Sequence, residues 1–289
     1  MSLYMALVPL ILLMGTLVYY PALKTFWQSF HDFDVLLPDD RSFSGLQNYL
    51  EALTKTNFFQ TLLRSLIIVV IALPLELLIG LSAALLLHSD FRGRNLVRTL
   101  ALIPWFLPPI VVGFMWSWIL NGQYGARNGL LYQMHLISDY HFWLQSPNAQ
   151  LIWVAVVHVW TRYPFALIVL LAGLQGVPHE VYEAAKVDGA KDWRLLVHIV
   201  LPLLRPSLAI VLVVEFISAF QIFDIIWSLT AGSTGGAINP YTKTLMILNY
   251  EVVFKNLNLG VGSALSYIIL ALSLVIGLNM VKQMNRGGE

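Results

Sequence analysis

Four side chains that can hydrogen-bond or stack recur at one-turn spacing within a strongly apolar stretch of the sequence. They are His158, Thr161, Arg162 and Phe165. Offsets of three, four and seven residues place them on one stripe of a helix. Polar groups in such a stretch usually face a bundle interior or a water-filled cavity. The stripe predicts a polar path for a hydroxyl-rich ligand, and Trp160 and Tyr163 beside it supply aromatic faces.

A second polar set lies in another apolar stretch and comprises Ser218, Gln221, Asp224 and Ser228. Offsets of three and four residues predict that Gln221, Asp224 and Ser228 share one face of a continuous helix. Structural roles are the alternatives: His158 could hydrogen-bond to a neighbouring helix, and Asp224 could pair with Arg162. Glu215 is expected to be buried against a partner subunit or protonated, and Glu76 to satisfy the backbone that Pro74 frees.

The elements that position these residues follow from composition. Of the 289 residues, 58% are hydrophobic and 11% are charged, against about 25% charged in a soluble domain. Net charge is +1, which does not suggest nucleic acid, and the absence of cysteine excludes disulfides and thiolate metal sites. Runs of about 20 apolar residues predict membrane-spanning helices. We expect six, at about 3–23, 66–87, 100–120, 151–174, 203–229 and 261–281.

Orientation follows from the lysines and arginines. With a cytoplasmic N-terminus, the inside segments at about 88–98, 174–205 and 282–289 hold nine of them. The longer outside segments at about 24–60, 121–150 and 231–258 hold six. The positive-inside rule therefore predicts that both termini are cytoplasmic. A signal peptide is the alternative for the first run, but the run lacks a basic start and a small-residue cleavage site.

A charged cassette at about 176–202 separates the fourth and fifth runs and faces the cytoplasm in this orientation. Pro178 suits the first turn of a helix, and Gly189 can take the left-handed conformation that ends one. Ala184 and Ala185 are small and allow another surface to approach closely. A second short helix is expected at about 193–199. The cassette predicts a helix–turn–helix that fits a cleft in another protein, with an ordinary interfacial loop as the alternative.

The same cassette carries a family resemblance. Glu183-Ala184-Ala185, then Gly189, Ile199 and Leu201-Pro202 at the spacing found here, resembles the EAA signature of permease subunits of binding-protein-dependent ABC importers. Further stretches resemble the sugar-type permeases, and in particular the maltose/trehalose-type oligosaccharide permeases. They are GLQNYLEAL, LIPWFLPPIVVGFMWSWIL, VWTRYPFALIVLLAGLQGVPHEVYEAAKVDGA and FDIIWSLTAGS.

This resemblance implies an all-α integral membrane protein with the type I ABC importer permease fold. It implies six transmembrane helices and a cytoplasmic coupling helix, with residues 1–289 forming a single permease domain in the bacterial inner membrane. The coupling residues would be Glu183, Ala184, Ala185, Asp188 and Gly189. The implied partners are a second permease, two cytoplasmic ATPases that bind ATP and Mg, and an external binding protein that delivers an oligosaccharide. The chain itself would be a transport subunit without a cofactor.

The sequence agrees with this division of labour. No G-x-x-x-x-G-K-[ST], H-E-x-x-H or G-x-S-x-G pattern occurs, so no phosphate-binding loop, catalytic residue or metal-ligand set is expected. The alternative function is an ion-coupled secondary transporter of a polar solute, which could use Glu76, Glu215 and Asp224. The cytoplasmic cassette and the lack of an obvious internal repeat favour the importer.

The group that compensates the charge of Arg162 determines which ligand the path would accept. An unpaired guanidinium deep in a span costs about 2.5–3.5 kcal/mol on insertion scales. We expect Glu215, Asp224 or the ligand to compensate it. If the ligand does so, the sugar hydroxyls or, in an acidic sugar, a carboxylate would bind the guanidinium. Neutral and acidic oligosaccharides therefore both remain open, with the neutral class ahead.

Overall fold

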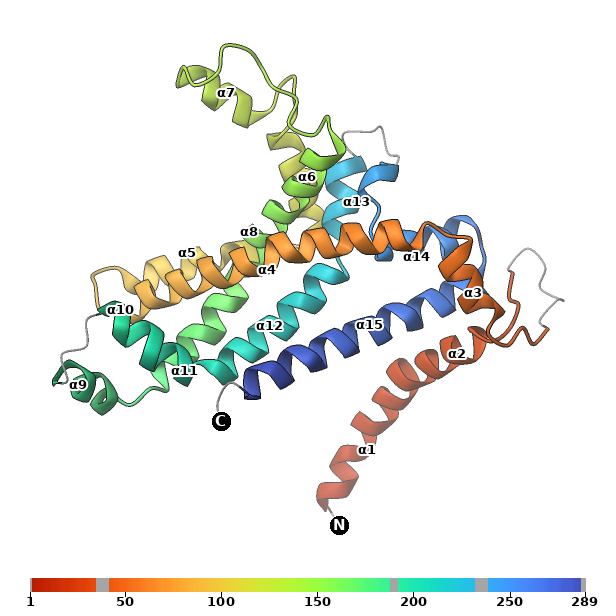
Figure 1. The fold of residues 1–289 in the computed structure, drawn as a ribbon, viewed down its shortest axis with the longest axis horizontal. Helices are drawn as coiled ribbons and strands as arrows, with labels where there is room; N and C mark the ends of the chain where they lie inside the picture. Colours follow the sequence, from red (N-terminus) through yellow and green to blue (C-terminus); the bar gives the residue numbers. More distant parts are fainter. Residues whose placement is uncertain (1, 35–41, 188–191, 232–238, 287–289) are drawn as a thin grey trace. The chain divides into compact units, whose positions relative to one another are not determined.

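The computed structural model describes residues 2–34, 42–187, 192–231 and 239–286, and helices are the regular structure in these ranges. The chain divides into two compact units. Unit 1 comprises residues 1–62 and 245–273, and unit 2 comprises residues 63–244 and 274–289. The long helices α4 (Phe58–His88) and α15 (Leu259–Arg286) contribute residues to both (Figure 1).

Unit 1 is built from both ends of the chain. Its remaining elements are α1 (Ser2–Met14), a π-helical segment (Gly15–Tyr19), α2 (Tyr20–Gln28), α3 (Gln47–Thr54), α14 (Leu245–Tyr250) and a π-helical segment (Glu251–Lys255). The buried amide of Asn48 donates to the carbonyl oxygens of Ser29 and His31 at 3.0 and 2.8 Å. The hydroxyl of Tyr267 on α15 donates to the carbonyl of Ala22 on α2 at 2.7 Å. These bonds join segments that lie far apart in sequence.

Unit 2 is organised around α8 (Pro147–Gln175), which packs against α5, α6, α12 and α13. The other elements of the unit are α5 (Arg94–Phe106), α6 (Pro109–Ile119), α7 (Ala126–Gln133), α9 (His179–Val187), α10 (Asp192–Leu195), a π-helical segment (Leu196–Val200), α11 (Leu201–Leu203), α12 (Arg205–Phe220), α13 (Asp224–Ala231) and a 3-10 turn (Pro240–Thr242). Buried polar side chains on α8 are thereby held inside the unit.

Close helix packing explains why a glycine, Gly80, stands in the second predicted span. A Cβ at Gly80 would lie 2.6 Å from the Cβ of Ala166 on α8 and 3.1 Å from the backbone nitrogen of Leu167. A larger residue there would force α4 away from α8. Glycine at this position therefore sets the distance between the two helices, as small residues do in membrane bundles.

The described helices account for six spans only if two are bent. Four helical stretches are long and apolar enough to cross a membrane: Leu7–Gln28, Phe58–His88, Pro147–Gln175 and Leu259–Met284. Two helix pairs meet the same test together, Arg94–Phe106 with Pro109–Ile119, bent by 96°, and Trp193–Leu203 with Arg205–Phe220, bent by 72°. The prediction of an all-α protein is confirmed.

The third and fifth predicted spans are not continuous helices. The third breaks at Leu107 and Pro108, where Pro108 and Pro109 cannot continue a helical hydrogen-bond ladder. The fifth span is bent between α11 and α12 and is interrupted again further along, because α12 ends at Phe220 and α13 begins at Asp224. The prediction that Gln221, Asp224 and Ser228 share one face of a continuous helix is therefore wrong.

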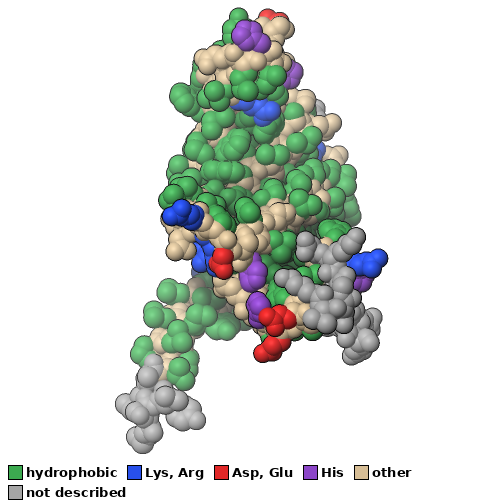
Figure 2. All heavy atoms as spheres, turned by 90° about the vertical axis from the view of Figure 1, so that its left-hand side faces the viewer, with side chains coloured by type: hydrophobic (Ala, Val, Ile, Leu, Met, Phe, Trp, Pro, Cys, Tyr) green, Lys and Arg blue, Asp and Glu red, His purple; other side chains and the backbone are tan. Residues whose placement is uncertain are grey.

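The surface of the protein exposes large apolar areas, and contact between such areas and water is unfavourable. Figure 2 shows hydrophobic side chains over most of one face, with few charged groups among them. Exposed large hydrophobic residues occur along α4, α6 and α15, for example Val70, Trp118 and Leu278, which are 71%, 63% and 67% exposed. Such surfaces are expected to face lipid or another subunit.

Candidate functional site

A cavity of about 280 Å³ lies in unit 2 between α8, the end of α12 and the start of α13. Six residues predicted to line a ligand path border it: His158, Thr161, Arg162, Ser218, Gln221 and Asp224. Apolar side chains and Pro109 complete the wall. The cavity has the composition of a small-molecule site, in which a few polar groups are set among apolar ones.

The break between α12 and α13 determines where Gln221 and Asp224 of the second polar set lie. Residues 221–223 leave the helical path, and both Gln221 and Asp224 border the cavity as a result. Asp224 also occupies the first turn of α13, where a negative charge is favoured. No proline or glycine stands at 221–223, so sequence patterns carry no signal for this break.

Arg162 is paired within the protein. Its Nε donates to Oε2 of Glu215 at 2.9 Å and its NH2 group donates to Oε1 at 3.3 Å. The guanidinium carbon lies 5.6 Å from the ring centre of Phe165. The Arg162 side chain is 23% exposed whereas that of Glu215 is fully buried. Of the three compensating groups expected for Arg162, Glu215 is the one in contact with it.

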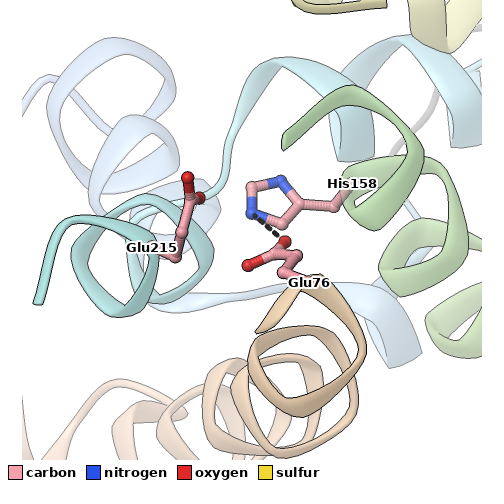
Figure 3. A group of neighbouring side chains, drawn as sticks. All are labelled: Glu76, His158 and Glu215. Carbon is pink, nitrogen blue, oxygen red and sulfur yellow. Dashed lines mark ion pairs between the residues drawn. The ribbon is translucent and has the colours of Figure 1, made fainter. Parts of the chain in front are cut away.

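A buried group of titratable side chains lies where α4, α8 and α12 meet. Glu76, His158 and Glu215 point toward one another (Figure 3), and atoms that could bind a metal lie within 4.8 Å of one another. Nε2 of His158 is 3.5 Å from Oε1 of Glu76. Glu76 thus faces His158 rather than the backbone near Pro74, and Glu215 is paired with Arg162 inside this chain. The expected roles of both glutamates are corrected accordingly.

Four other residues predicted for the path lie outside the cavity lining. Trp160 packs edge-on against Trp116 at 5.8 Å, and the hydroxyl of Tyr163 donates to the carbonyl of Ala101 at 3.0 Å. Phe165 lies 6.1 Å from Trp105. Ser228 is fully buried and donates to the carbonyl of Asp224 at 2.7 Å. The first three contacts join α8 to α5 and α6, and the bond of Ser228 lies within α13.

The connection between α6 and α8 contains a polar core that sequence patterns did not reveal. The buried amide of Asn128 donates to the carbonyls of Gly122 and His141 at 3.2 and 2.9 Å and accepts from Nε1 of Trp143 at 2.8 Å. The Arg127 guanidinium lies 3.9 Å from the centre of the Trp143 ring. Burial there lowers the pKa of Arg127. These contacts stabilise a compact fold in residues 121–146.

The predicted coupling loop forms helix α9, in which Ala185 is buried and Glu183 and Ala184 are exposed. Tyr182 stacks on His88 at 6.2 Å and packs against the apolar core at the ends of α4, α8 and α12. Burial raises the pKa of Tyr182. Asp188 and Gly189, also predicted to couple, lie outside the described residues. The buried face anchors the loop, and Glu183, Ala184 and the 72%-exposed Trp193 remain accessible.

Comparisons with known proteins agree with the resemblance drawn from the cassette. Residues 76–284 match the family described as "Binding-protein-dependent transport system inner membrane component". The chain is 35% identical over 279 residues to the trehalose/maltose transport system permease protein MalF of Thermococcus litoralis, covering 96% of this chain and 91% of that one. It is 34% identical over 281 residues to the trehalose transport system permease protein SugA of Mycobacterium tuberculosis, covering 96% and 87%.

A solved structure has the same fold. A chain of a bacterial alginate ABC transporter, in complex with an alginate pentasaccharide-bound periplasmic protein, superposes with a TM-score of 0.82. The match covers 100% of this chain and 95% of that one, at 20% sequence identity. The predicted type I permease fold is therefore confirmed.

Proposed function

Because the chain belongs to the family of inner membrane components of binding-protein-dependent transport systems, we propose that it forms half of the translocation path for a neutral oligosaccharide. In this proposal it spans the inner membrane together with a second, homologous permease. An external binding protein delivers the sugar, and two cytoplasmic ATPases supply the energy. The chain binds no nucleotide itself.

The charge of the cavity is the observation that carries the choice of ligand. The Arg162 guanidinium forms an ion pair with the Glu215 carboxylate through two hydrogen bonds. It is therefore not available as a free cation for a carboxylate ligand. Asp224 borders the same cavity and would repel an anion. Hydroxyl groups, by contrast, can donate to Asp224 and bond with Ser218 and Gln221. The relatives that are 34–35% identical are named for trehalose and maltose transport, which is consistent with a neutral sugar.

The orientation of the chain rests on its charges. Lys and Arg are denser in the segments that contain α9 and the α4–α5 connection than in residues 121–150. Both termini and α9 are therefore placed in the cytoplasm, where the exposed side chains Glu183, Ala184 and Trp193 would contact an ATPase. The α6–α8 connection, built around Asn128, is placed outside, on the side of the binding protein.

A secondary transporter is the competing function, because Glu76, Glu215 and Asp224 are carboxyl groups within helical spans. In the described part of the chain Glu215 is committed to Arg162 and Glu76 faces His158. Neither Glu76 nor Glu215 borders the cavity, whereas an ion-coupling carboxylate must reach both the ion and its path, which leaves Asp224 alone of the three in a position to do so. This arrangement favours the importer.

Substrate competition in the assembled transporter tests the proposed ligand. Complexes in liposomes, supplied with the cognate binding protein, would be given a radiolabelled neutral glucose disaccharide and an excess of unlabelled neutral or uronic acid oligosaccharide. We expect the neutral competitor to reduce uptake and Asp224→Asn to lower it with assembly intact. Competition by the uronate alone would contradict the neutral assignment.

A further inference from the structure

A buried polar group lies behind the wall of the cavity, within unit 2. Its members are Glu76 on α4, His158 on α8 and Glu215 on α12 (Figure 3). The side chains of both glutamates are fully buried and that of His158 is 4% exposed. The two carboxyl groups are therefore shielded from bulk solvent where the three helices converge, and His158 also borders the cavity.

With both glutamates ionised and His158 neutral, this group together with Arg162 carries one net negative charge. The charged or titratable groups that face it are Glu76 from α4, His158 and Arg162 from α8, and Glu215 from α12, while Asp224 of α13 lies on the cavity side. Arg162 neutralises Glu215 through two hydrogen bonds. Glu76, if ionised beside a neutral imidazole, would leave one buried negative charge without a counter-ion. Such a charge is strongly unfavourable.

The hydrogen-bonding groups of Glu76 and His158 also indicate that a proton lies between them. Among the described residues, neither carboxyl oxygen of Glu76 has a hydrogen-bond partner, and neither has Nε2 of His158. Oε1 of Glu76 and Nε2 of His158 nevertheless lie 3.5 Å apart. If the neutral imidazole carries its own proton on Nδ1 and Glu76 is ionised, two lone pairs face each other in this buried contact. One proton turns this contact into a donor–acceptor pair.

We propose that Glu76 and His158 form a proton-binding site that holds one shared proton between Oε1 and Nε2. With that proton the group formed by Glu76, His158, Arg162 and Glu215 has no net charge. A divalent metal ion is the rival occupant. It would leave a net positive charge and would have to take the oxygens of Glu215, which already accept hydrogen bonds from Arg162.

The shared proton has a consequence for the cavity. An ionised Glu76 would compete with Glu215 for Arg162, because both carboxyl groups lie in the same buried cluster. A neutral Glu76 leaves Arg162 with Glu215, and the guanidinium then remains at the cavity wall. Glu76 is therefore a positioning residue that acts on the cavity through Arg162.

The test compares Glu76→Gln with the parent and with Glu76→Ala in the purified complex. A glutamine amide can donate to His158 as the protonated acid does, whereas alanine cannot. The proton stabilises the folded state, so the parent should lose thermal stability as alkaline pH removes it. Glu76→Gln should keep the parent's stability at neutral pH without that alkaline loss. Glu51→Gln is the matched control, since Glu51 binds Lys55 at 2.6 Å in unit 1, and it should keep the loss.

Infrared spectroscopy gives a direct readout. The parent and Glu51→Gln should show the C=O stretch of a protonated carboxyl that disappears at alkaline pH, and Glu76→Gln should lack it. Absence of this band from the parent, or equal destabilisation by Glu76→Gln and Glu76→Ala, would overturn the proposal. So would one equivalent of bound metal whose removal by a chelator destabilises the parent but not Glu76→Gln. None of these measurements requires sugar or ATP, so they are independent of the proposed function.

Discussion

Arg162 and Glu215 lie 53 residues apart in sequence and form a two-point ion pair, with Nε and NH2 of the arginine 2.9 and 3.3 Å from the two carboxylate oxygens. The pair joins α8 to α12 inside the membrane-spanning part of the chain. The pair also shows which of two roles Arg162 has, a structural ion pair or a free cation that binds the ligand. The pairing is part of the fold, and the partly exposed guanidinium borders the cavity without being a free cation.

The first prediction follows from this pair. Arg162→Gln should leave Glu215 buried without a partner, and the loss of one member of a buried pair costs about 3–5 kcal/mol. The double change Arg162→Gln with Glu215→Gln should recover much of that loss, because no charge is then left buried. The yield and melting temperature of the assembled complex, measured in detergent, test both variants. A single variant as stable as the parent would contradict the structural role of the pair.

A second prediction concerns the contact between α6 and α13. A Cβ at Gly113 would overlap the hydroxyl of Ser228 and lie 3.1 Å from the carbonyl oxygen of Ile225. Gly113→Ala should therefore destabilise the protein by about 1–3 kcal/mol through overpacking. Gly277→Ala is the matched control, since its Cβ would make an ordinary contact with Val213 at 3.8 Å. Equal melting temperatures for the two variants would show that α6 and α13 do not pack this closely.

The connection between α6 and α8 provides the third prediction. Asn128→Ala removes a buried amide that bonds to Gly122, His141 and Trp143, and each buried group left unpaired costs about 1–3 kcal/mol. Residues 121–146 should become sensitive to protease while the helical core stays intact. Gln133→Ala, an exposed change on the same helix α7, should keep the parent's resistance. If Asn128→Ala is equally resistant, the amide does not hold this connection together.

The fourth prediction concerns the exposed face of α9, which we propose contacts an ATPase. Glu183→Trp adds bulk to the exposed face of α9 without disturbing the anchored face that carries Tyr182 and Ala185. We expect the permease pair to assemble but the ATPases to detach during purification, or their ATP hydrolysis to become independent of substrate. Ser89→Trp, an exposed change just after the end of α4, is the control and should leave both properties unchanged. Normal coupled uptake with Glu183→Trp would exclude this face as the docking element.

Much of the fold could be predicted because membrane helices are long and apolar. The helices Phe58–His88, Pro147–Gln175 and Leu259–Arg286 each contain a predicted span. The prolines at 108 and 109 account for the bend in the third span. The break at 221–223 was not predictable, since no proline or glycine stands there.

The site was only partly predictable for a related reason. The sequence identifies Arg162 as a residue that needs a partner, and it leaves Glu215 and Asp224 as equal candidates. Helix spacing orders residues within one helix but does not fix how two helices face each other. The same limitation explains Glu76, whose partner His158 lies 82 positions along the chain on another helix. Asn128 carries no pattern at all, because its partners are backbone groups of the loop and the side chain of Trp143.

ATP dependence of uptake is the measurement that tests the proposed function most directly. The chain would be reconstituted in liposomes with its permease partner, the two ATPases and the sugar-loaded binding protein, with ATP enclosed on the ATPase side. We predict that a neutral disaccharide accumulates only when ATP, the ATPases and the binding protein are all present, and that collapsing ion gradients has no effect. Accumulation driven by a proton or sodium gradient through this chain without the ATPases would contradict the proposal.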